Sequence, residues 1–128
     1  MILVVDDYPD TLDVWSVSLQ AAGFEVVTAV DGLTALTMAE TLVPDLVVLD
    51  LELPGRSGYD VATLLRRNPA TRHIPLIAAT GFSHEAQLAR ARRAGFDVIV
   101  IKPCDPDELI AHIRRLLGGA DTKQRATQ

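Results

Sequence analysis

Four short runs of apolar residues divide the chain, and a residue capable of chemistry follows each of them directly. The runs are Ile2–Val5, Leu46–Leu49, Leu76–Ala79 and Val98–Ile101, and the residues that follow are Asp6 with Asp7, Asp50, Thr80 and Lys102. Continuous apolar runs of this length are typical of parallel strands buried on both faces. A further short strand is expected over Glu25–Ala29.

Stretches with apolar residues at helical spacing separate these strands. Capping residues or prolines predict helix starts near Pro9, Asp31, Ser57, Ser83 and Asp105. The helix after Ser83 has mostly alanine as its apolar content, so we expect it to be the least firmly packed. Trp15 falls on the apolar stripe of the first helix, which favours core packing. A strand followed by a helix, five times over, predicts an α/β fold: a doubly wound, five-stranded parallel sheet with helices on both faces.

Composition limits the class of protein. The chain has 128 residues, 48% of them hydrophobic, and a net charge of −5. One domain of common size is expected, and the acidic balance argues against nucleic-acid binding by this domain itself. Cys104 is the single cysteine, which suits a reducing compartment. No apolar run reaches the length of a membrane span and no leader is evident, so we expect a soluble, cytoplasmic domain over 1–117, followed by a disordered polar tail or the start of a linker over 118–128.

The residues after the strands should converge, because ligands bind outside the carboxyl ends of the strands in open parallel sheets. Asp6, Asp7 and Asp50 would then lie within a few ångström of one another and repel. A bound divalent cation relieves that repulsion. An all-oxygen site of carboxylates and waters suits Mg²⁺ or Mn²⁺ and leaves positions for a phosphoryl oxygen.

Thr80 and Lys102 extend this chemistry. A lysine is a compact positive charge suited to phosphate, and a threonine hydroxyl can donate to a phosphoryl oxygen. Aspartates are known to act as covalent nucleophiles through an aspartyl-phosphate. Asp50 stands alone after the central run and is the best nucleophile, whereas the Asp6-Asp7 pair is better placed to hold metal. The sequence therefore predicts an aspartate that becomes phosphorylated.

The chain resembles the receiver domain of two-component response regulators. The motifs that carry the resemblance are Asp6-Asp7, the segment 50–58 (Asp-Leu-Glu-Leu-Pro-Gly-Arg-Ser-Gly), Thr80-Gly81 and Lys102-Pro103, in that order and spacing. The resemblance implies a flavodoxin-like sheet with strand order 2-1-3-4-5. The segments Thr80-Gly81-Phe82 and Gly95-Phe96-Asp97 resemble receivers attached to hybrid histidine kinases more than receivers attached to transcription factors.

The resemblance also implies roles for the site. Asp50 would accept a phosphoryl group from a sensor histidine kinase or a histidine phosphotransfer protein. Asp7, Asp50 and the backbone carbonyl of Glu52 would ligate Mg²⁺, with Asp6 acting mainly through water. Lys102 and Thr80 would contact the phosphoryl group. The domain would catalyse only its own phosphorylation and dephosphorylation and would not be a metabolic enzyme. A downstream partner or output domain would recognise the surface of the last helices.

Four further positions concern the switch: Pro103, Glu52, Phe82 and Ile99. The resemblance implies a cis Lys102-Pro103 bond and assigns the lifetime of the phosphoaspartate to Glu52 and Phe82. Many receivers carry an aromatic residue three positions before the lysine, but Ile99 stands there in this chain. An isoleucine has no ring to switch, so coupling between Thr80 and this position is in question.

Two alternatives stay open at this point. One is a phosphohydrolase with an aspartyl nucleophile, for which Glu52 has the spacing of a second acid. The other is a receiver-like interaction module with atypical or no phosphorylation switching, which Ile99 favours. Arg90, Arg92 and Arg93 form a basic cluster that we interpret as a solvated helix face.

Overall fold

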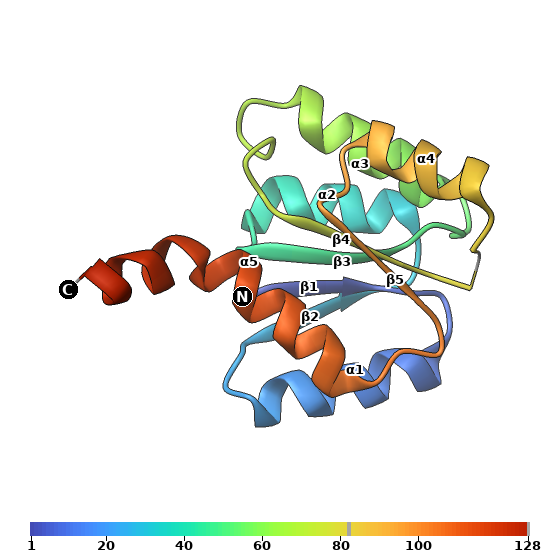
Figure 1. Cartoon of the computed structure of the whole chain (residues 1–128). Helices are drawn as coiled ribbons and strands as arrows, with labels where there is room; N and C mark the ends of the chain where they lie inside the picture. Colours follow the sequence, from blue (N-terminus) through green and yellow to red (C-terminus); the bar gives the residue numbers. More distant parts are fainter. Residues whose placement is uncertain (82, 128) are drawn as a thin grey trace.

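Five parallel strands form one sheet in the order β2-β1-β3-β4-β5 (Figure 1). The computed structural model describes residues 1–81 and 83–127, with side chains up to residue 118. The strands are β1 (Ile2–Val5), β2 (Val26–Ala29), β3 (Leu46–Asp50), β4 (Leu76–Thr80) and β5 (Val98–Ile101). The predicted fold class and strand order are confirmed.

Helices cover both faces of the sheet. They are α1 (Pro9–Ala21), α2 (Gly32–Leu42), α3 (Gly58–Arg67), α4 (Glu85–Ala94) and α5 (Pro106–Thr127). Figure 1 shows α1 and α5 on one side of the sheet and α2, α3 and α4 on the other. Each layer has its own core, because successive side chains of a strand point to opposite faces. In β1, for example, Leu3 packs in the α2–α3–α4 layer while Ile2 packs in the α1–α5 layer.

The three inner strands are buried on both faces, but the two edge strands, β2 and β5, are partly exposed. Every residue of β1, β3 and β4 is buried. The expectation that β5 would be buried in the same way is wrong, because β5 is an edge strand. Its Val98 and Ile99 are partly exposed and its Ile101 is 40% exposed.

Helix caps agree with the sequence in three cases and disagree in one. Asp31 accepts a hydrogen bond from the Thr34 backbone at 2.7 Å, and Ser57 accepts one from the Asp60 backbone at 3.2 Å. Asp105 accepts one from the Asp107 backbone at 2.8 Å. The prediction of a cap at Ser83 is wrong: α4 begins at Glu85 after an extended His84, with no side-chain cap bond. Among the residues that the structure describes, Ala91 is the one residue of α4 that is buried, fewer than in α1, α2 or α3, which agrees with the expectation that this helix is the least firmly packed.

The last helix is longer than expected. It continues to Thr127, so residues 119–127 are helical and not irregular. Residue 128 lies outside the described part of the chain. The division into a receiver domain over 1–117 and a tail or linker stays a prediction. None of the helices described in the structure is both long and apolar enough to cross a membrane.

Candidate functional site

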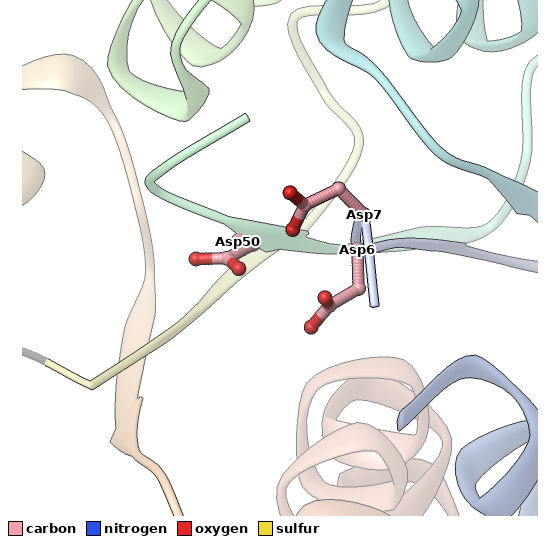
Figure 2. A group of neighbouring side chains, drawn as sticks. All are labelled: Asp6, Asp7 and Asp50. Atoms are coloured by element: carbon pink, nitrogen blue, oxygen red, sulfur yellow. The ribbon is translucent and has the colours of Figure 1, made fainter. Parts of the chain in front are cut away.

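Three carboxylates meet at the carboxyl edge of the sheet (Figure 2). β1 and β3 are paired so that Val5 lies beside Leu49, which brings the aspartates that follow them together. One carboxylate oxygen from each of Asp6, Asp7 and Asp50 lies within 4.8 Å of the others. Asp6 and Asp50 are buried and Asp7 is exposed, so the cluster faces solvent on one side.

The backbone after each strand fixes the two buried carboxylates. The Tyr8 backbone N–H donates to Asp6 Oδ1 at 2.9 Å, and the Glu52 backbone N–H donates to Asp50 Oδ1 at 3.1 Å. The chain then returns closely past Asp50 at Gly58, where an added Cβ would lie 2.2 Å from the Asp50 carbonyl oxygen. Glycine is therefore required at the start of α3 for the loop to hold this shape.

Lys102, the residue directly after β5, closes the site. Its Nζ donates to Asp6 Oδ2 at 2.5 Å and to Asp50 Oδ2 at 3.1 Å. Burial opposes the charge on the lysine, but the hydrogen bonds and the charges of Asp6 and Asp50 outweigh it and raise the pKa of Lys102. Burial raises the pKa of Asp50, against the opposing effects of the Glu52 N–H and Lys102. The ammonium therefore bridges two carboxylates that would otherwise repel.

The remaining predicted residues that the structure describes lie at or near this edge. Thr80 is fully buried at the end of β4, and its carbonyl accepts from the Lys102 backbone N–H at 2.7 Å. The Lys102-Pro103 bond is cis, as predicted. Glu52 is exposed beside Asp50, and Ile99 is partly buried against the core of the α2–α3–α4 layer. Phe82 lies outside the described residues, so its role stays a prediction.

One contact in the site could not be found from the sequence. The indole ring of Trp15 on α1 has its centroid 6.0 Å from Lys102 Nζ. Helical spacing correctly predicts Trp15 in the core, where it is 4% exposed. The spacing does not predict its contact with Lys102. Beside the pair is a hollow of about 460 Å³, whose lining comes from α1 and the loop after β5: Asp10, Thr11, Val14, Trp15, Lys102, Pro103 and Cys104.

The donor set decides what the cluster can hold. Oxygen is the only ligand atom that the three carboxylates offer, which fits a hard divalent cation and excludes a thiolate or imidazole preference. A positive lysine beside the carboxylates suits a group carrying negative charge, such as a phosphoryl group. The arrangement can therefore bring a cation, an acceptor carboxylate and a phosphoryl-binding lysine together at one place.

Comparison with known proteins points to the same family. The family model described as "Response regulator receiver domain" matches residues 2–114. The regulator RpaA of Synechocystis, described as a DNA-binding dual master transcriptional regulator, is 36% identical over 99% of this chain and 53% of its own length. The DNA-binding response regulator MtrA of Mycolicibacterium smegmatis is 39% identical over 91% of this chain and 50% of its own length. The chain thus spans about half the length of these curated relatives.

A solved structure supports the assignment. The receiver domain of the sensor histidine kinase PA1611 from Pseudomonas aeruginosa PAO1, which has a magnesium ion coordinated in its active-site cleft, superimposes with a TM-score of 0.86 at 29% identity. The match covers 91% of this chain and 96% of that one. The shared fold, the acidic cluster and the matched relatives together support the function of a phosphoacceptor switch. The chain therefore belongs to the family of response regulator receiver domains of two-component signalling.

Proposed function

We propose that Asp50 is the phosphoacceptor of this domain and that a phosphohistidine is the donor. The observation that carries the proposal is the position of Lys102 Nζ, which contacts both Asp50 and Asp6 within the acidic cluster. An oxygen of the Asp50 carboxylate forms the new bond to phosphorus while the bond from phosphorus to the histidine nitrogen breaks. The displaced histidine leaves as neutral imidazole after taking up a proton.

Asp6, Asp7 and Asp50, with the backbone carbonyl of Glu52, would hold Mg²⁺ or Mn²⁺ in this proposal. The oxygen donor set supports it, and so does the magnesium ion in the cleft of the Pseudomonas aeruginosa receiver. When bound, the cation would offset negative charge on the phosphoryl oxygens. Lys102 offsets the same charge from the side of β5, and Thr80 stands at the neighbouring strand end to donate its hydroxyl.

The same groups would act in the loss of the phosphoryl group, so self-catalysed phosphorylation and hydrolysis are part of the proposal. Glu52, exposed beside the acceptor, is proposed to tune the lifetime of the phosphoaspartate, together with Phe82. The donor is a sensor histidine kinase or a histidine phosphotransfer protein, and the domain acts in the cytoplasm. The output passes to a partner or a further domain through the last helices.

Intact-mass measurement after incubation with acetyl phosphate and MgCl₂ tests the proposal. The wild type should gain one phosphoryl group, and Asp50→Asn should gain none. Asp60→Asn is the matched control, because Asp60 is an exposed aspartate of α3 outside the cluster and should leave the gain unchanged. A wild type that gains no phosphoryl group, or an Asp50→Asn variant that gains one, contradicts the assignment. Steady release of phosphate from small esters would favour a phosphohydrolase instead.

A second candidate is a receiver-like interaction module without phosphorylation switching. Ile99 favours it, because this side chain packs against the core and has no polar tip that a movement of Thr80 could engage. Spectra of the backbone amides of the last helices, recorded with and without acetyl phosphate, separate the two candidates. A gain of phosphate that leaves the amide signals of α4, β5 and α5 unchanged would support the interaction module.

A further inference from the structure

Trp15 makes a contact in this site in addition to its packing in the core. It comes from α1, packs in the layer formed with α5, and presents its ring to the Lys102 ammonium at 6.0 Å. The two carboxylates that bind the ammonium belong to the residue directly after β1 and to the last residue of β3. The ammonium is therefore held by carboxylates at the ends of two strands and by an aromatic ring of a helix.

A hollow beside this pair leaves space into which the Lys102 side chain could move. The side chain of Lys102 is 24% exposed, whereas Trp15 is 4% exposed. The hollow of about 460 Å³ is lined by both residues, so open space adjoins the Lys102 side chain. A lysine has a flexible stem and a strongly hydrated charge, which favours movement into such a space. The indole ring, which lines the same hollow, attracts the cation and so opposes its movement away from the ring.

We propose that Trp15 is a positioning residue for phosphoryl transfer, holding the Lys102 ammonium against Asp6 and Asp50. The inference rests on the proposed function of Asp50 as acceptor. It makes two claims that can be measured separately: the ring and the ammonium are in contact, and that contact speeds phosphorylation.

The first claim can be read from fluorescence, because Trp15 is the single tryptophan of the chain. Replacing Lys102 with methionine keeps a flexible side chain but removes the charge beside the indole. We expect the emission maximum or intensity of the full chain to change in Lys102→Met and to stay unchanged in Arg56→Met, an exposed cation elsewhere. Emission spectra of Lys102→Met that superimpose on those of the wild type would overturn the contact.

The second claim requires variants that separate packing from the aromatic face. Trp15→Phe keeps a ring, and Trp15→Leu fills much of the space without one. Leu12 is the control: it is buried on the same face of α1, and Leu12→Ala weakens the same core without touching Lys102. Phosphorylation rates are measured by intact mass across a range of acetyl phosphate concentrations in MgCl₂, under conditions where urea unfolding shows that each variant is folded.

We expect Trp15→Leu to lower the maximal rate about three- to tenfold, as a cation–π contact of ordinary strength would give. Trp15→Phe and Leu12→Ala should stay within about twofold of the wild type, since a ring survives in one and the contact survives in the other. The positioning role is overturned if Leu12→Ala is as slow as Trp15→Leu, if Trp15→Phe is as slow as Trp15→Leu, or if Trp15→Leu matches the wild type. A wild type that gains no phosphate overturns the proposed function and the positioning role together, while the emission spectra still decide the contact.

Discussion

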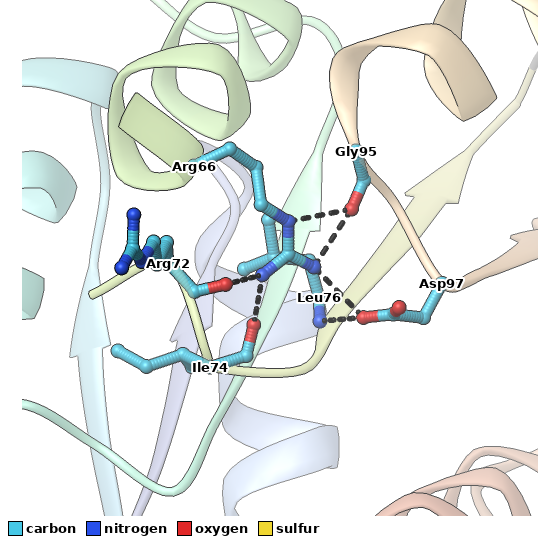
Figure 3. A network of polar contacts seen from close by, with 6 residues as sticks. All are labelled: Arg66, Arg72, Ile74, Leu76, Gly95 and Asp97. Atoms are coloured by element: carbon cyan, nitrogen blue, oxygen red, sulfur yellow. Dashed lines mark hydrogen bonds and ion pairs between the residues drawn. The ribbon is translucent and has the colours of Figure 1, made fainter. Parts of the chain in front are cut away.

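The guanidinium of Arg66 on α3 lies 2.9 Å from the carboxylate of Asp97, the residue directly before β5 (Figure 3). The same carboxylate oxygen accepts the backbone N–H of Leu76 at 2.8 Å. Arg66 also donates to the backbone carbonyls of Gly95, Arg72 and Ile74. One side chain therefore joins the end of α3, the start of β4 and the connection from α4 to β5.

Replacing Arg66 should destabilise the fold more than an ordinary surface change. Arg66→Ala removes a charged donor from three loop carbonyls and Asp97, and we expect a loss of about 2–4 kcal/mol in the free energy of unfolding. Arg66→Lys should recover only part of this, because an ammonium lacks the planar fork. Urea unfolding measures both.

The neighbouring arginine is a matched control. Arg67 is exposed on the same helix, so Arg67→Ala should change the free energy of unfolding by no more than about 0.5 kcal/mol. If the two alanine variants have equal stability, the contacts of Arg66 contribute nothing to the fold.

Gly95 and Gly23 should differ in their tolerance of alanine. Both have a positive φ, +111° and +100°, so alanine strains either backbone by about 1–2 kcal/mol. An added Cβ at Gly95 would also lie 2.6 Å from Arg66 Cγ, whereas Gly23 has no atom within 4 Å of that position. Gly95→Ala should therefore be the more destabilising in urea unfolding. The double variant Arg66→Ala/Gly95→Ala should lose less free energy of unfolding than the two single variants lose together. Full additivity would count against this account.

Mg²⁺ should stabilise the wild type through the acidic cluster. A ligand that binds only the folded state at a hundred times its Kd adds about 2.7 kcal/mol, so the melting temperature should rise as MgCl₂ is added and fall again with a chelator. Asp7→Asn should greatly reduce that rise, because Asp7 is the exposed carboxylate of the cluster. Asp10→Asn, an exposed aspartate in the first turn of α1, should retain it. An equal rise in both variants would place the ion elsewhere.

These contacts mark the limit of what the sequence predicts. The convergence of Asp6, Asp50 and Lys102 could be predicted, since residues after parallel strands meet at one edge and the resemblance to receivers implies the strand order. Arg66 and Trp15 could not be assigned in this way. Each lies on a helix, and its partner belongs to another element whose relative placement depends on packing. The exposed face of β5 cannot be predicted for a related reason, because an apolar run does not reveal whether its strand is central or at the edge.

The cap at Asp31 should make stability depend on pH at the acidic end. The Thr34 backbone N–H lowers the pKa of this carboxyl below its ordinary value of 3.8, and the Thr34 hydroxyl adds to the effect. The folded state therefore favours the ionised form, so the stabilisation is present above pH 3.8 and is lost as the pH falls below it. Urea midpoints of wild type and Asp31→Asn should differ most near neutral pH and converge towards pH 3. Asparagine still caps the helix, so a difference that is independent of pH would contradict the electrostatic part of this cap.

Cys104 should be unreactive in the folded domain although it lines the hollow beside Lys102. Burial raises the pKa of its thiol to about 11, and the nearby carboxylate of Glu108, 3.5 Å from the sulfur, adds to the rise. The thiolate is the reactive form, so at pH 8 alkylation by iodoacetamide should be at least about tenfold slower in the native chain than in urea, where the pKa is about 8.5. The native rate should keep increasing up to pH 10. Glu108→Gln should speed the reaction by lowering the pKa, while Glu85→Gln, an exposed acid on α4, should not. A native rate equal to the rate in urea would show that the thiol is neither buried nor held by Glu108.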